Sequence, residues 1–167
     1  MILDPKLKIR AQGDRELVMS RDFAAPRALV FEAFTRPELL KQWLGAFNGW
    51  KLVVCEIDLR VGGAYRWVWR NANREIEMGA GGVYLEIITG ERIVATERYD
   101  DAWYRGDAIV TTAFAERSGG TALTMTVQYE SAEVRDGVLS SPASSGVEAG
   151  FDVLAEVLRR ELSAPSP

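Results

Sequence analysis

Two acidic residues lie in segments whose alternating apolar pattern is typical of β-strands. Glu86 belongs to the segment 82–87, and Glu97 ends the segment 91–97. A carboxylate that faces an apolar cavity is desolvated, which raises its pKa and suits it to act as an acid, a base or a ligand anchor. We favour an outward orientation for both, because acidic side chains are rarely buried unpaired. The arginines expected to pair with them are Arg66, Arg70 and Arg98, and such a pair inside a cavity would instead hold the polar end of a ligand.

Aromatic side chains could form the walls of such a cavity. Alternation along 63–70 places Tyr65, Trp67 and Trp69 on one strand face, and Trp103 lies in an expected loop where it could gate an entrance. Aromatic rings offer large rigid surfaces, although they could equally fill a close-packed core. The sequence singles out no catalytic residue. The candidate ligand-binding residues are Trp43, Phe47, Tyr65, Trp67, Trp69, Tyr84, Glu86, Glu97, Met125, Phe151 and Leu154.

Several kinds of chemistry are excluded by what the sequence lacks. Histidine is absent, which rules out Ser-His-Asp and Cys-His relays, two-histidine iron centres and ordinary zinc sites. The lone cysteine, Cys55, follows an apolar run and is expected to be a buried, inert thiol. The segment 58–63 (DLRVGG) lacks the spacing of a phosphate loop and is expected to form a turn. No metal site and no cofactor are therefore expected.

The elements that must position these residues follow from changes in hydrophobic period. Residues 16–23 have strand character, and the segments 26–34 and 37–44 have the apolar spacing of short helices. The patterns Thr35 to Glu38 and Ser145 to Glu148 match capping boxes, and the second would begin a long amphipathic helix that ends near residue 162. Residues 131–143 are expected to be short helix and loop. Strands are expected at 51–58, 63–70, 75–88, 91–98, 107–116 and 121–130.

This order predicts an α+β fold in which a curved antiparallel sheet of about seven strands wraps around the C-terminal helix. Gly79, Gly81 and Gly82 predict a bulge or sharp bend in the segment 75–88. A bent sheet cannot contact the helix along its whole length, so a pocket is expected between them. The expected organisation is an N-terminal extension (1–15), one domain (16–163) and a tail (164–167).

Several segments occur along the chain in a familiar order: FAAPRALVFEAFTRPELLKQW (23–43), DLRVGGAYRW (58–67), GVYLEI (82–87), ERIVATE (91–97), GGTALTMTV (119–127) and the stretch 131–158. Together they resemble the Hsp-90 ATPase activator homologue family of the START-like (SRPBCC) superfamily. The resemblance covers about residues 16–162 and implies a helix-grip fold. Superfamily members include lipid and hormone carriers, cyclases or dehydratases, oxygenase subunits and co-chaperone domains. Oxygenases need histidine-ligated iron, and the eukaryotic activators contact the chaperone through a separate N-terminal domain, so neither an oxygenase nor a chaperone partner is expected.

Composition narrows the expected partners. The net charge of −4 gives no general attraction to nucleic acid or to an anionic membrane surface, and no apolar run reaches the length of a membrane span. A cytoplasmic protein that forms a homodimer is therefore plausible. The leading expectation is that the cavity binds a small hydrophobic or aromatic molecule. Two alternatives remain open: a cyclase, dehydratase or hydrolase that uses a pocket carboxylate, and a protein-interaction module.

Overall fold

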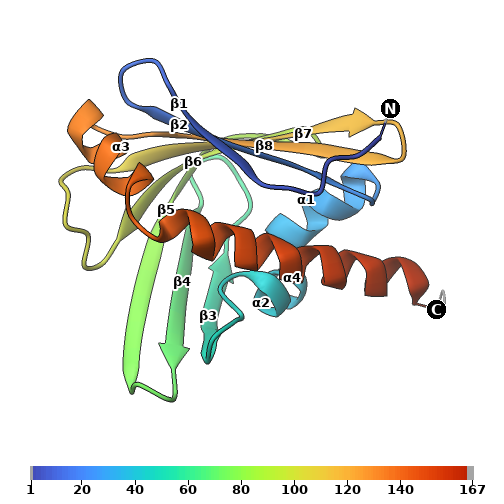
Figure 1. Ribbon diagram of the computed structural model, residues 1–167. Helices are drawn as coiled ribbons and strands as arrows, with labels where there is room; N and C mark the ends of the chain where they lie inside the picture. The colour runs from blue at the N-terminus through green and yellow to red at the C-terminus, as the bar shows by residue number, and fades with distance from the viewer. Residues whose placement is uncertain (1, 165–167) are drawn as a thin grey trace.

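A long C-terminal helix lies against the concave face of a strongly bent antiparallel sheet. The computed structural model describes residues 2–164, apart from the side chain of Ser144. Figure 1 shows β1, β2, β8, β7 and β6 forming one part of the sheet, while β5, β4 and β3 turn in a clearly different direction. The helix α4 crosses the space between these two parts, and α1 and α2 pack against it (Figure 1). The expected α+β helix-grip architecture is confirmed.

The sheet has eight strands in the order β1-β2-β8-β7-β6-β5-β4-β3. They are β1 (Lys8–Gln12), β2 (Glu16–Phe23), β3 (Trp50–Ile57), β4 (Ala64–Asn71), β5 (Ile76–Ile88), β6 (Arg92–Tyr99), β7 (Ala108–Arg117) and β8 (Gly120–Gln128). The helices are α1 (Arg27–Thr35), α2 (Pro37–Trp43), α3 (Ala132–Leu139) and α4 (Ala143–Ser163). No helix within residues 2–164 combines the length and apolar character needed to cross a lipid bilayer.

The strands β3 to β8 pair in sequence order, as the short connections predict, and β2 closes the order by pairing with β8. Residues 8–12, expected to belong to an extension, form β1 on the outer edge of β2. This extra edge strand explains why the sheet has eight strands instead of about seven. Residues 165–167 of the expected tail lie outside the described residues.

The irregularity of β5 lies later than its glycines predict. The pairing of β5 with β4 runs in regular register through Gly79, Gly81 and Gly82. The register shift occurs in the pairing with β6, between Tyr84 and Glu86. Gly82 serves a different purpose, because a Cβ atom there would collide with the carbonyl oxygen of Thr96. The glycine therefore allows β5 and β6 to approach closely.

Neither expected capping box forms. The N-cap of α2 is Arg36, which makes no side-chain cap bond, and the hydroxyl of Thr35 instead donates to the carbonyl of Phe31 at 3.0 Å. The helix α4 begins at Ala143, so Ser145 already lies inside its first turn. In both helices the N-cap position is occupied by a residue other than the Ser or Thr of the motif. The hydroxyl of that Ser or Thr therefore cannot cap the helix.

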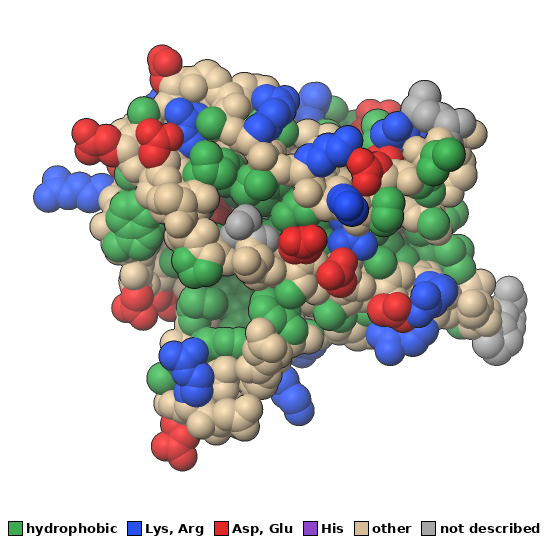
Figure 2. All heavy atoms as spheres, viewed as in Figure 1, with side chains coloured by type: hydrophobic (Ala, Val, Ile, Leu, Met, Phe, Trp, Pro, Cys, Tyr) green, Lys and Arg blue, Asp and Glu red, His purple; other side chains and the backbone are tan. Residues whose placement is uncertain are grey.

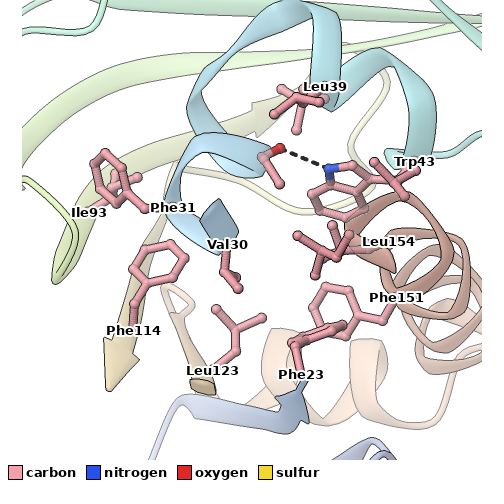
Figure 3. Packing of buried hydrophobic residues seen from close by; sticks show 14 of the residues in the cluster. Phe23, Val30, Phe31, Leu39, Trp43, Ile93, Phe114, Leu123, Phe151 and Leu154 are labelled. Atoms are coloured by element: carbon pink, nitrogen blue, oxygen red, sulfur yellow. Dashed lines mark hydrogen bonds between the residues drawn. The ribbon is translucent and has the colours of Figure 1, made fainter. Parts of the chain in front are cut away.

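The main core lies where α1, α2 and the C-terminal part of α4 meet the inner face of the sheet, with buried residues from β2 to β8 (Figure 3). The ring of Phe23 meets Phe151 edge-on at 5.6 Å, and Leu154 is fully buried beside them. The indole of Trp43 donates to the carbonyl of Ala33 at 2.8 Å, shown dashed in Figure 3, so this tryptophan fixes α2 against α1. The core therefore holds α4 by its middle and C-terminal turns.

One ion pair ties α4 to the sheet. Arg21 of β2 is buried and donates from Nη1 to Asp152 of α4 at 2.7 Å, whereas the Asp152 side chain is 66% exposed. Nε of Arg21 has no hydrogen-bond partner within the described residues. The exposed aspartate is therefore the main partner of a buried cation.

Replacing Asp152 by alanine is expected to destabilise the protein by about 1–2 kcal/mol, because it leaves the guanidinium buried without its counter-charge. Arg21→Met, which removes the buried charge itself, is expected to cost less. Urea denaturation of the two variants and the wild type measures the difference. The reverse order of stabilities would contradict this account of the pair.

Candidate functional site

A cavity of about 650 Å³ lies between the bent sheet and the N-terminal half of α4. Its wall is built by residues of β2 and β4 to β8, by α2 and the loop after it, by the β6–β7 loop and by the first turns of α4. Figure 2 shows apolar side chains gathered around a hollow beneath the start of α4. The wall residues of α4 end at Phe151, whereas its buried core residues continue to Leu158, so the hollow lies beneath the N-terminal half of the helix.

Nine of the eleven candidate residues lie on this wall. They come from four strands, from α2 and its following loop, and from α4, so the fold brings together residues far apart in the sequence. They are Trp43, Phe47, Tyr65, Trp67, Trp69, Tyr84, Glu97, Met125 and Phe151. Their role in binding a ligand remains a prediction.

Strand β4 supplies three of these rings through simple alternation. The ring of Trp67 lies 4.6 Å from Tyr65 and 6.0 Å from Trp69, measured between centroids. Trp69 donates its indole N–H to the carbonyl of Leu44 at 3.0 Å and so anchors the loop after α2. The buried indole nitrogen of Trp67 has no acceptor in the described part of the chain. Trp67 is therefore free of the structural hydrogen bond that occupies Trp69.

The carboxylate of Glu97 lies on the cavity wall, where the outward orientation expected from the sequence is wrong. Within residues 2–164 it makes no hydrogen bond and no ion pair. Burial raises its pKa to about 7, since the charged form loses hydration that no nearby positive charge replaces. Its neighbour Arg98 faces outward and donates to Asp107 at 2.6 Å.

Four tyrosines of the cavity wall lie near enough to Glu97 for its charge to act on their hydroxyls. Its negative charge is the main cause that raises the pKa of Tyr99, and burial adds to it. For Tyr65, Tyr104 and Tyr129, burial raises the pKa first and the charge of Glu97 adds to it. The hydroxyl of Tyr65 donates to the carbonyl of Thr96 at 2.6 Å. These hydroxyls therefore stay protonated near neutral pH and can donate or accept hydrogen bonds.

Two candidate residues lie elsewhere. Glu86 faces solvent and accepts a hydrogen bond from Arg92 at 2.5 Å, because the register shift after Tyr84 turns it away from the cavity. Its outward orientation is as expected, but its partner is not one of the three predicted arginines. Leu154 is fully buried in the core beneath the cavity, one turn beyond the last wall residue of α4. We therefore leave both out of the candidate site.

The expected arginine partners form other pairs on the outer face. Arg66 pairs with Asp100 and Arg70 with Glu77, each at 2.5 Å. The lone thiol, Cys55, was expected to be buried but is half-buried, and this partial burial raises its pKa. Among the described residues, no group of three or more acidic or thiol side chains could hold a metal ion.

Sequence reasoning missed several wall residues. Tyr99 follows Glu97 by two positions in β6, so the alternation rule would have placed it beside Glu97 on the same face. Tyr129 shares the alternation of β8 with Met125, and Tyr104 reaches the wall from the β6–β7 loop beside Trp103, which was expected in a loop as a possible gate. The signal that could have found Tyr99 and Tyr129 is the strand alternation that they share with Glu97 and Met125.

Comparisons with known proteins agree with this architecture. A family described as "Activator of Hsp90 ATPase homolog 1-like protein" matches residues 24–159. A crystal structure of a Rhodobacter sphaeroides protein is 30% identical, covers 92% of this chain and 98% of that one, and superposes with a TM-score of 0.86. A Chromobacterium violaceum protein is 31% identical, over 86% of this chain and 96% of that one, with a TM-score of 0.73. An AHSA1-like protein from Aeromonas hydrophila, 18% identical over 91% and 97% of the two chains, shares the fold with a TM-score of 0.71. No match was found among curated proteins.

Proposed function

The chain belongs to the family of activator of Hsp90 ATPase homolog 1-like proteins, and we propose that it binds a small, largely apolar molecule in the cavity beneath α4. The observation that carries the proposal is a cavity of about 650 Å³ with a wall that is mostly apolar and aromatic. Protein interiors otherwise pack as densely as organic crystals. A space of this size is far larger than a packing defect and falls within the range of small-molecule sites.

The wall also has the composition of a binding site. Aromatic rings supply broad apolar contact surfaces, and a few polar groups can orient a ligand. Trp67 contributes both, because its ring faces its neighbours on β4 and its indole N–H is unpaired within the described chain. Trp103, which is 66% exposed, also lines the cavity, so it reaches both solvent and the wall. Trp103 is therefore the residue that we propose as a gate of the cavity.

A neutral fluorescent probe tests the proposal. N-phenyl-1-naphthylamine is expected to bind once per chain with a saturable rise in fluorescence, and to raise the melting temperature. Trp67→Ala is expected to weaken this binding about tenfold, since it removes a large contact surface. Val68→Ala changes the next residue of β4, outside the cavity wall, and is the matched control. Absence of saturable binding, or equal losses in the two variants, would defeat the proposal.

A second candidate function rests on Glu97. A carboxylate with a pKa of about 7 has the protonation behaviour that general acid–base catalysis requires near neutral pH. Such a role would add turnover to binding in the same cavity. Mass spectrometry of a bound molecule before and after incubation distinguishes binding alone from turnover. With Glu97→Gln, the bound molecule should be recovered unconverted. Conversion by that variant would remove Glu97 from catalysis.

A further inference from the structure

The charges on the cavity wall are of one sign. Among the described residues that line the cavity, the only ionisable groups besides tyrosines are Glu97 and Asp101. No lysine or arginine reaches that wall, and the chain has no histidine. A carboxylate, phosphate or sulfate of a ligand would therefore enter a pocket that offers it no counter-charge and two negative neighbours.

Glu97 is also unusual among the carboxylates of this protein. The buried Asp22 pairs with Arg117 at 3.0 Å, and the exposed Glu86 pairs with Arg92. Glu97 has no such partner within residues 2–164, although it lies in a desolvated part of the wall. Glu97 is half-buried in the cavity wall, where its charged form is poorly hydrated. An unpaired charge in such a place is costly to a fold, so its retention suggests that a ligand supplies the opposite charge.

We propose that the ligand is a small amphiphilic amine, with its ammonium group bound at Glu97 and its apolar body held by the aromatic wall. This inference rests on the proposed function, because it names the class of molecule that the same cavity selects. The ammonium supplies the missing opposite charge and donates charge-assisted hydrogen bonds to the carboxylate. The tyrosine rings around Glu97 add surfaces that attract cations.

The electrostatics of the site support a cation over a neutral donor. The surroundings raise the pKa of Glu97 because nothing in the described residues stabilises its charged form. A bound ammonium would stabilise that form, whereas an alcohol would leave most of the cost in place. The other titratable groups on the wall are tyrosines, whose pKa values are raised, and the exposed Asp101. Binding of a cationic ligand should therefore change the ionisation of Glu97 more than that of any other group on the described wall.

Three ligands with one apolar body test the inference: 4-phenylbutylamine, 4-phenylbutan-1-ol and 4-phenylbutanoate. At pH 8, displacement of N-phenyl-1-naphthylamine is expected to give an affinity at least about tenfold higher for the amine than for the alcohol. The carboxylate is expected to bind at least about tenfold more weakly than the alcohol. At pH 5.5 the amine should lose about tenfold in affinity, since Glu97 must release a proton to bind it, while the alcohol should change little.

Glu97→Gln is expected to reduce the ratio of amine to alcohol affinity to about one, because it removes the negative charge but keeps the size of the side chain. Glu86→Gln makes the same change on the outer face and should leave the ratio unaltered. An alcohol or carboxylate that binds as tightly as the amine would overturn the inference, and so would a ratio unaffected by Glu97→Gln. Failure of the proposed function has a separate signature, in which none of the three compounds displaces the probe and the probe itself does not bind.

Discussion

Replacing Ala95 by phenylalanine is expected to lower the affinity for an apolar probe by about a hundredfold or more, because the new ring would occupy the space of the ligand. Ala95 is buried in the middle of β6, pairs with Tyr84 and Val110, and lies on the cavity wall. Because the side chain of Ala95 is a single methyl group, a larger side chain at this position would extend into the cavity. A ring at this position points into the cavity instead of into close-packed core, so the cost in stability should stay below about 2 kcal/mol.

Val94 supplies the control for this experiment. It precedes Ala95 in β6, pairs with Thr111, and is not part of the cavity wall. Val94→Phe should bind the probe as the wild type does. Titration of N-phenyl-1-naphthylamine against both variants, with urea denaturation to confirm folding, gives the result. Normal binding by a folded Ala95→Phe protein would mean that the probe binds elsewhere.

The second large effect concerns pH and stability. Glu97→Gln is expected to raise the free energy of unfolding at pH 8 by about 2–3 kcal/mol more than at pH 4.5, relative to wild type. In the unfolded chain the glutamate titrates near 4.5, while burial raises its pKa in the folded protein to about 7. Between these values the folded protein keeps a proton that the unfolded chain has released. The wild type therefore loses stability as the pH rises through this window, and the variant lacks this loss.

Urea denaturation of wild type and variant at several pH values between 4.5 and 8 measures the effect. Every other titratable group is present in both proteins, so the difference between their pH profiles isolates Glu97. Glu86→Gln is the matched control and should show no such difference, since Glu86 is exposed and paired with Arg92. Parallel profiles for wild type and Glu97→Gln would show that Glu97 ionises in the folded protein as it does in water.

The strands and helices were largely predictable because their hydrophobic periods differ and most of their connections are short. The predicted 16–23 coincides with β2, and the meander order follows from tight turns between neighbouring strands. Helix starts were less predictable. A Ser or Thr three residues before a glutamate satisfies the capping pattern, but whether it caps depends on where the chain leaves its preceding turn, which tertiary packing sets. Thr35 and Ser145 both match the pattern and neither caps its helix.

The candidate site was predictable as a set of faces but not as an orientation. Alternation places Tyr65, Trp67 and Trp69 together, and the structure puts all three on the cavity wall. It could not distinguish Glu97 from Glu86, because a single extra residue in a strand moves every later side chain to the other face. That irregularity lies between Tyr84 and Glu86, where no glycine or proline marks it.

The two parts of α4 separate residues that pack in the core from residues that border the cavity. Leu154, Val157 and Leu158 are buried in the core, while Ala143, Gly146 and Val147 border the cavity. The fold should therefore tolerate substitutions in the first turns of the helix. If the cavity binds a ligand as proposed, homologous proteins could differ in ligand while keeping the same fold. The same separation makes this chain a practical starting point for engineering sensors, since residues of the cavity wall can be redesigned while the core is left unchanged.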